Sequence, residues 1–149
     1  MILVDANLLL YAYHSGSPKH AASRRWLESV LSGTELVRFA WVTLWAFLRI
    51  ATHPRVFERP LAIADAQAAI SSWLEQPVVG IVDPGERHWS ILQGLIDDGQ
   101  TVGALVMDAA LAALAIEHGA TLCTTDRDFS RFRGLTWANP LEQARQAER

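Results

Sequence analysis

The feature that most constrains the fold of this chain is a pair of short predicted strands that each end directly before a carboxylate. The run Ile2-Leu3-Val4 is followed at once by Asp5, and a predicted strand at 121–125 is followed by Asp126. Short apolar runs are typical of strands that are buried on both faces of a parallel sheet. In open α/β sheets, ligands bind beyond the carboxyl ends of the strands. We therefore expect Asp5 and Asp126 to lie at the same edge of one sheet.

A third acid stands at the start of an apolar helix. Residues 108–118 read D-A-A-L-A-A-L-A-I-E-H and precede Gly119, the residue type that accepts the left-handed turn past a helix end. This pattern predicts a helix of roughly three turns. The helix has almost no polar face, which predicts burial between other layers. Asp108 can join Asp5 and Asp126, and these three acids form the predicted site.

The remainder of the chain alternates predicted strands with predicted helices. Further strands are expected at 36–39, 78–82 and 135–138. Helices are expected to begin at Leu8 and Pro18 and to cover 41–53, 62–74 and 85–98, with a polar tail from about 141 to 149. This alternation indicates an α/β fold with a mostly parallel sheet of four to five strands. Because 50% of the 149 residues are hydrophobic and no linker interrupts them, we expect one domain over 1–149.

Composition narrows the class of protein. A net charge of −3 means that no global basic field indicates nucleic-acid binding. The single cysteine, Cys123, cannot form an internal disulfide, and as a buried thiol it fits a reducing cytoplasm. No signal peptide is recognised, and no apolar run approaches the roughly 20 residues of a membrane span. The five histidines show no zinc-binding spacing.

The three acids have both a structural and a chemical explanation. Taken singly, Asp108 could complement the helix dipole, while Asp126 with Asp128, or Asp5 with Asn7, could form a local turn. If the three converge, their repulsion raises at least one pKa unless a cation lies among them. Ligands that are all oxygen select a hard divalent ion, Mg²⁺ or Mn²⁺. Such an ion can activate water and neutralise charge on a phosphoryl oxygen.

Four motifs carry a resemblance to a known family. In chain order they are I-L-V-D-A-N-L-L-L-Y-A, F-L-R-I-A-T-H-P-R-V-F, D-A-A-L-A-A-L-A-I-E-H-G-A and T-T-D-R-D-F-S-R-F. Their order and spacing resemble those of PIN-domain ribonucleases, and specifically of the VapC-type toxins of bacterial toxin–antitoxin pairs. The resemblance covers the chain from residue 1 to about Pro140.

The resemblance implies a three-layer α/β/α PIN-like fold and an Mg²⁺- or Mn²⁺-dependent endoribonuclease that cuts single-stranded or structured RNA, such as tRNA or rRNA. It also implies a homodimer and a cognate antitoxin that inserts a segment at the active site. By motif position, the metal-binding and catalytic acids are Asp5, Asp108 and Asp126. Supporting hydrogen bonds are expected from Asn7, Thr125 and Asp128.

Arginines are the candidate RNA contacts. Lys19 is the only lysine, and the other twelve cations are arginines. Arg127, Arg131 and Arg133 flank the Asp126 strand end and are expected to attract RNA. Arg49 is expected either to contact phosphate or to pair with a site acid. A solvated basic face is the structural alternative. The six tryptophans are expected mainly in the core or in dimer contacts.

One position departs from the family pattern. Where the family has a second acid before F-L-R, this chain has Ala46. Asp128 could compensate through water, or three acids could suffice. The chain could instead be an impaired natural member, or an engineered form in which the glutamate was replaced. The alternative function is therefore a PIN-like module that binds RNA or protein without cutting. A phosphatase or phospho-acceptor domain with Asp5 as nucleophile is disfavoured, because Lys19 is the only lysine to assist it.

Overall fold

The fold is built on one parallel sheet. The computed structural model describes residues 1–149 and has five strands in the order β3-β2-β1-β4-β5, and every neighbouring pair is parallel. The strands are β1 (Ile2–Val4), β2 (Val37–Phe39), β3 (Val79–Ile81), β4 (Thr121–Cys123) and β5 (Trp137–Ala138). The predicted α/β fold is confirmed, and the sheet is parallel throughout.

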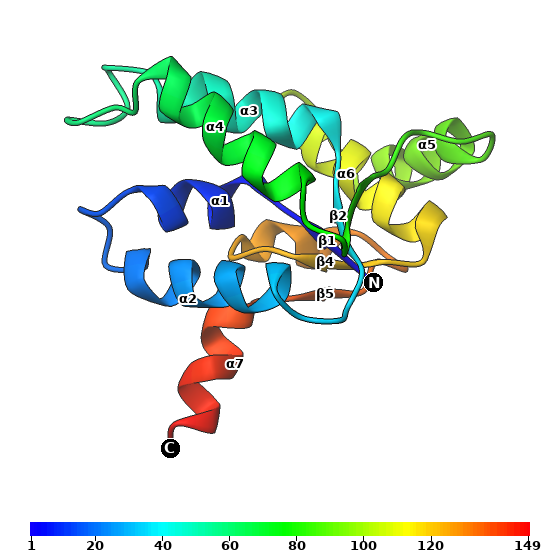
Figure 1. The fold of residues 1–149 in the computed structure, drawn as a ribbon. Helices are drawn as coiled ribbons and strands as arrows, with labels where there is room; N and C mark the ends of the chain where they lie inside the picture. The colour runs from blue at the N-terminus through cyan, green and yellow to red at the C-terminus, as the bar shows by residue number, and fades with distance from the viewer.

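Seven α-helices and one short 3₁₀ helix, η1, connect the strands. They are α1 (Ala6–Tyr13), α2 (His20–Leu31), α3 (Trp41–Ala51), α4 (Ile63–Leu74), α5 (His88–Gly99), α6 (Leu105–His118), η1 (Arg127–Arg131) and α7 (Pro140–Ala147). In Figure 1, α1, α2 and α4 lie to one side of the strands, while α5 and α6 lie together on the other. None of these helices has both the length and the apolar character that crossing a membrane requires.

The three layers follow from the alternation of side chains along the strands. Ile2 and Val4 of β1 point into a core cluster shared with α1, α2, α3 and α4, whereas Leu3 points into a second cluster with α5 and α6. Successive side chains of a strand point to opposite faces of the sheet. Apolar residues at every position of a strand therefore require helices on both faces.

Cys123 is one of the residues that the sheet buries. Its side chain is buried in the same cluster as Val4. Burial raises the pKa of its thiol to about 12, so the thiolate is not available for chemistry near neutral pH. The predicted role of Cys123 as a buried apolar thiol is confirmed.

An aromatic cluster organises the larger core. Trp73 of α4 is 2% exposed and packs on Phe47 with ring centroids 4.9 Å apart, on Tyr13 at 5.6 Å and on Phe39 at 5.8 Å. These contacts join α1, α3, α4 and β2. Trp73 is thus the side chain through which the helices of this face pack on one another.

The start of α6 and the end of β4 differ from the sequence prediction. Helix α6 begins at Leu105 and not at Asp108, because Gly103 adopts a left-handed conformation with φ of 63° and ends the preceding loop. Asp108 therefore lies in the first turn of the helix. Strand β4 ends at Cys123 and not at residue 125, so two threonines separate it from Asp126.

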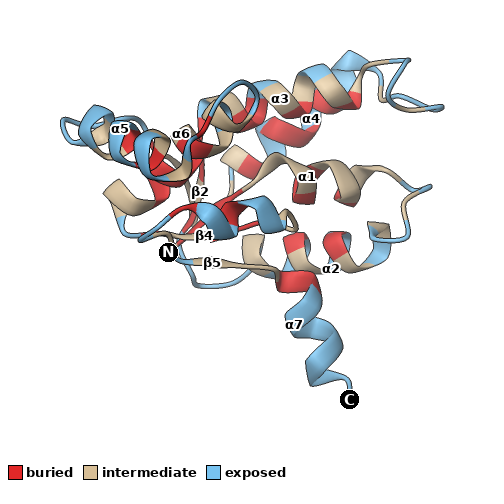
Figure 2. Cartoon of the chain, turned by 180° about the vertical axis from the view of Figure 1, so that it is seen from behind, coloured by how far each residue is buried: buried red, intermediate tan, exposed pale blue.

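Two further segments differ in detail from the sequence prediction. Helix α2 begins at His20 because the Ser17 hydroxyl accepts a hydrogen bond from the Lys19 amide at 3.1 Å and holds residues 17–19 in a turn. The polar tail predicted from about 141 is instead helix α7. Its start is capped by Asn139, whose side chain accepts from the Leu141 amide at 3.1 Å. Pro140 and Leu141 are buried, while the remainder of α7 is exposed, as Figure 2 shows.

Replacing the central aromatic side chain should test this account of the core. Trp73→Ala should lower the free energy of unfolding by about 3–5 kcal/mol, because it leaves a cavity between three helices. Urea denaturation followed by circular dichroism would measure the loss. Trp89→Ala is the matched control, since Trp89 is 63% exposed, and it should change stability by less than about 0.5 kcal/mol. Equal losses in the two variants would contradict the assignment of Trp73.

Candidate active site

Asp5 lies where β1 and β4 end side by side. Val4 is paired with Cys123 across the two strands, and the Asp5 amide donates to the Cys123 carbonyl at 3.0 Å. The Asp5 carboxylate caps α1 by accepting from the Ala6 amide at 2.7 Å. Its other oxygen accepts from the Thr124 hydroxyl at 2.7 Å. The carboxylate is thus held in one orientation by contacts from two different segments.

Thr124 joins the two strand ends, and sequence reasoning missed it. Its buried hydroxyl donates to Asp5 and accepts from the Asn7 side-chain amide at 3.2 Å and from the Asp126 backbone amide at 3.0 Å. The sequence predicts a supporting hydrogen bond from Thr125. The register of β1 and β4 places Thr124, and not Thr125, beside Asp5. The motif T-T-D does not distinguish the two threonines. Thr125 instead lines a different cavity.

The structure brings Asp108 and Asp126 to the same edge as Asp5. Burial, followed by the charges of Asp5, Asp126 and Asp128, raises the pKa of Asp108 to about 6, and Arg131 opposes the rise. Burial also raises the pKa of Asp5. The hydrogen bonds from Thr124 and Ala6 oppose that rise, and the charge of Asp126 adds to it. The carboxylates are therefore close enough to repel one another.

Asp128 lies at the rim of this acid cluster, which we define as Asp5, Asp108 and Asp126. Its side chain is exposed, and its backbone amide donates to the Asp126 carboxylate at 2.8 Å. Asp126 thereby caps η1 in the Asx-type turn that the sequence also suggested. Asp126 therefore has two roles: it caps η1, and it belongs to the acid cluster.

A cavity of about 130 Å³ opens beside Asp5 and Asp108, and Ala46 lines it. The position at which the sequence departs from the family pattern therefore faces two of the three acids. A methyl group stands there, and the cavity leaves space beyond it. The departure concerns the site itself and not a distant part of the fold.

The acid cluster has the type of side chains that bind cations, but these side chains do not surround a single ion position. No three Asp, Glu, His or Cys side chains lie close enough together to hold one ion directly. The side-chain oxygen of Asn7 is buried and has no hydrogen-bond partner, although the amide nitrogen of the same side chain donates to Thr124. An unpaired buried acceptor next to repelling carboxylates is costly unless a ligand or an ordered water completes it.

The predicted arginines occupy different places. Arg131 lies close enough to lower the pKa of Asp108. Arg127 pairs with Glu142 at 2.9 Å. Arg49 is exposed and forms none of the chain's ion pairs, so the alternative of a salt bridge to a site acid is absent. Its contact with phosphate stays a prediction.

The tryptophans divide between the core and the surface. Trp73 is buried, as expected, but Trp41 and Trp45 are 42% and 61% exposed and stack on each other with centroids 6.5 Å apart. Together with Met107 they line an apolar cavity of about 310 Å³. Met107 also lines the cavity beside Asp5, so this apolar surface adjoins the acid cluster.

Comparison with known proteins identifies the family. Residues 2–135 match the PIN domain. The chain is 46% identical over 140 residues to Ribonuclease VapC37 of Mycobacterium tuberculosis, covering 94% of this chain and 97% of that protein. It is 41% identical over 143 residues to Ribonuclease VapC33 of the same organism, covering 96% of this chain and 100% of that protein.

Solved structures share the fold at lower identity. The VapBC2 complex of Rickettsia felis, bound to a DNA fragment from its promoter, has a TM-score of 0.67 at 18% identity and covers 93% of this chain and 98% of the matched chain. VapC20 of Mycobacterium tuberculosis, a sarcin–ricin loop cleaving toxin, has a TM-score of 0.63 at 20% identity over 91% and 99%. The predicted resemblance is confirmed, and the chain belongs to the PIN-domain family and, within it, to the VapC ribonucleases of toxin–antitoxin systems.

Proposed function

We propose that this chain is a metal-dependent endoribonuclease toxin that hydrolyses a phosphodiester bond in structured or single-stranded RNA, with tRNA or rRNA as the substrate class. Asp5, Asp108 and Asp126 are the acids that bind the metal. One observation carries the proposal: carboxylates from the end of β1, the first turn of α6 and the end of β4 repel one another, and Arg131 is the one cation that opposes them at Asp108.

Mg²⁺ or Mn²⁺ fits the residues at this edge. The donor set consists of carboxylate oxygens together with the unpartnered side-chain oxygen of Asn7, and oxygen ligands favour hard divalent ions. Mg²⁺ usually keeps several waters and is held by one or two carboxylates. That mode agrees with carboxylates that neighbour one another without closing into a cage. When bound, the ion would activate water and neutralise charge on the phosphoryl group.

The chain's own residues supply orientation and charge. Thr124 is a positioning residue, because its hydroxyl holds the Asp5 carboxylate and the Asp126 backbone at once. Preorganised groups need no rearrangement during the reaction. A phosphodiester must also approach a negatively charged edge. Arg131 lies at the acid cluster and can attract it, and the exposed Arg49 of α3 is proposed as a second phosphate contact.

The partners of the chain are proposed from its relatives and its surface. A solved relative from Klebsiella pneumoniae is a toxin–antitoxin complex, and we propose a cognate antitoxin that neutralises this chain. We also propose a homodimer in which a second copy covers the apolar surface around Trp41, Trp45 and Met107, since exposed apolar patches of this kind mark protein contacts. The cytoplasm is the proposed location, where RNA is present and Cys123 stays reduced.

A second function is favoured by Ala46. Because a methyl group lines the cavity beside Asp5 and Asp108, the site has one acid fewer than the family pattern. The chain would then be an impaired nuclease that acts as an RNA- or protein-binding module. The two functions differ in whether the protein as it stands turns over RNA.

Removal of the metal or of single acids tests the nuclease. Purified protein should cleave total tRNA or rRNA in Mg²⁺ or Mn²⁺, lose this activity in EDTA and regain it when the ion is restored. Asp5→Asn and Asp126→Asn should abolish cleavage, because they remove charge while keeping the side-chain shape. Asp65→Asn, at an exposed acid of α4, is the control and should cleave normally. Persistent cleavage by both site variants would remove these acids from the mechanism.

Restoring an acid at position 46 separates the two functions. If the chain is an impaired nuclease, Ala46→Glu should raise the affinity for Mn²⁺ and the rate of RNA cleavage by about tenfold or more, since ligand-sphere changes have effects of this size. Ala46→Gln is the matched control, with the same shape and no charge. Calorimetric Mn²⁺ titration and gel-based cleavage assays give the two readouts. Wild-type cleavage that Ala46→Glu leaves unchanged would point to a sufficient three-acid site.

The repulsion at Asp108 predicts a pH dependence of stability in metal-free buffer. The pKa of Asp108 is about 6 in the folded chain against an ordinary 3.8, so between these values the unfolded chain releases a proton that the folded chain retains. Stability is therefore greatest below the lower value and falls as pH rises through about 6. Thermal denaturation from acid to neutral pH should show this fall, and Asp108→Asn should reduce it. Parallel curves for the two proteins would contradict the assigned repulsion.

A further inference from the structure

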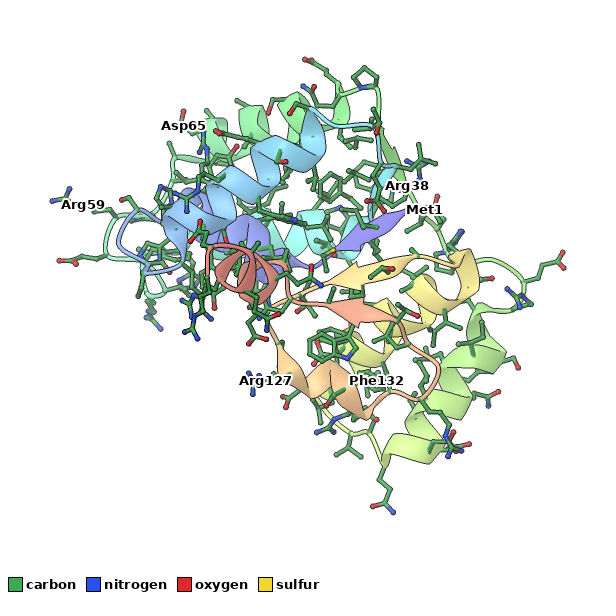
Figure 3. All side chains as sticks on the ribbon, turned by 90° about the horizontal axis from the view of Figure 1, so that it is seen from below. Met1, Arg38, Arg59, Asp65, Arg127 and Phe132 are labelled. Atoms are coloured by element: carbon green, nitrogen blue, oxygen red, sulfur yellow. The ribbon has the colours of Figure 1, made fainter.

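A second and larger polar cavity lies outside the acid cluster. It has a volume of about 370 Å³ and is bordered by the start of α2, the residues that follow β4, and α7. We call it the α2–α7 groove. Four cations line it, namely Lys19, Arg25, Arg127 and Arg145. In the view of Figure 3, α7 is seen end-on beside α2, and Arg127 projects from the surface.

The groove is positively charged within a chain whose net charge is negative. Only two acids, Glu142 and Glu148, line it beside the four cations, and the whole chain carries −3. Glu142 is paired with Arg127 at 2.9 Å. Lys19, Arg25 and Arg145 take part in none of the chain's ion pairs. The Lys19 ammonium lies over the Tyr11 ring, 4.9 Å from its centroid, but none of the three cations has a carboxylate partner, so each can bind an anionic ligand.

Backbone donors add to this positive surface. Helix α2 has twelve residues and no side-chain cap, and neither the Ala21 nor the Ala22 amide has a hydrogen-bond acceptor. Ala22 is part of the groove lining. Free amides and the positive end of the helix dipole favour an anion at this place. The side-chain and backbone charges therefore point to the same class of ligand.

The groove and the acid cluster adjoin, because two consecutive residues belong to them. Thr125 lines the groove, and the next residue is Asp126 of the acid cluster. Consecutive Cα atoms lie about 3.8 Å apart, so a strand of nucleic acid at Asp126 is already at the mouth of the groove. A second hollow, lined by Arg127, Arg145 and Arg149, continues the basic surface along α7.

We propose that the α2–α7 groove binds the phosphate backbone of the RNA on one side of the cleaved bond, with Lys19, Arg25 and Arg145 as phosphate contacts. This inference rests on the proposed ribonuclease function. The groove has no aromatic lining residue, and Leu141 is its only large aliphatic side chain. A protein partner would need such side chains as anchors. Contacts to phosphate need only charge, and they position RNA without reading its sequence.

The test compares two double variants with equal loss of charge. Arg25→Gln with Arg145→Gln removes two groove cations, while Arg55→Gln with Arg59→Gln removes two exposed cations from the loop between α3 and α4. Figure 3 shows Arg59 far from Arg127 on the surface. All four arginines are exposed and outside the ion pairs, so the fold should be retained, which circular dichroism would verify.

Binding is measured without cleavage, in the Asp5→Asn background, with a fluorescent mixed-sequence single-stranded RNA. The groove variant should bind about tenfold more weakly at low salt, and its plot of log Kd against log salt should be flatter by about 1.4, since each lost phosphate contact contributes about 0.7 for a single strand. The control variant should match the Asp5→Asn parent. An unchanged slope in the groove variant would overturn the proposal.

Two further experiments test the groove separately from the proposed ribonuclease function and distinguish RNA from a protein ligand. With an active site, the groove variant should show a raised KM and an unchanged kcat for long RNA. Cleavage with an unchanged KM refutes the groove and leaves the nuclease standing, whereas groove-dependent binding without any cleavage refutes the nuclease alone. A polyglutamate peptide is the probe for an acidic protein segment. Loss of polyglutamate binding with retained RNA binding would overturn the groove as an RNA site.

Discussion

The parallel pairing of β1 with β4 is the constraint on which the site depends. It places Asp5 level with Thr124, and one hydroxyl then holds the Asp5 carboxylate, the Asn7 amide and the Asp126 backbone. Carboxylates that repel one another would move apart on a flexible loop. They stay together here because the strand ends and the first turn of a helix hold them. Their electrostatic repulsion favours the binding of a cation at this edge.

The two hydrophobic cores hold the strands in place against the repulsion between the acids. Apolar side chains alternate along β1 and β4 into helices on both faces, so the strands cannot slip in register without exposing a whole row of buried residues. Trp73 ties the helices of one face together. On the other face, the apolar helix α6 carries Asp108 in its first turn. The cores therefore give the acids their positions as well as giving the protein its stability.

Charge is distributed unevenly around this frame. The chain is acidic overall, but Lys19, Arg25 and Arg145 lie together in the α2–α7 groove, and Arg131 lies at the acid cluster itself. In the separate cavity beside Asp5 and Asp108, Ala46 supplies an uncharged lining. An anionic substrate would meet attraction from the groove cations, while the cavity beside Asp5 and Asp108 lacks one acid of the family pattern. The first favours binding, and the second bears on turnover.

The sequence by itself indicated the α/β class, three acids near the ends of elements and the family, because short apolar runs, a glycine-terminated helix and motif order are local properties. It did not distinguish Thr124 from Thr125, and it indicated a polar tail where α7 forms. Those features depend on strand register and on the packing of Leu141 against distant helices. The tertiary structure alone placed Ala46 against the acids and gathered Lys19, Arg25 and Arg145 into one groove, since residues far apart in the chain meet only through long-range contacts.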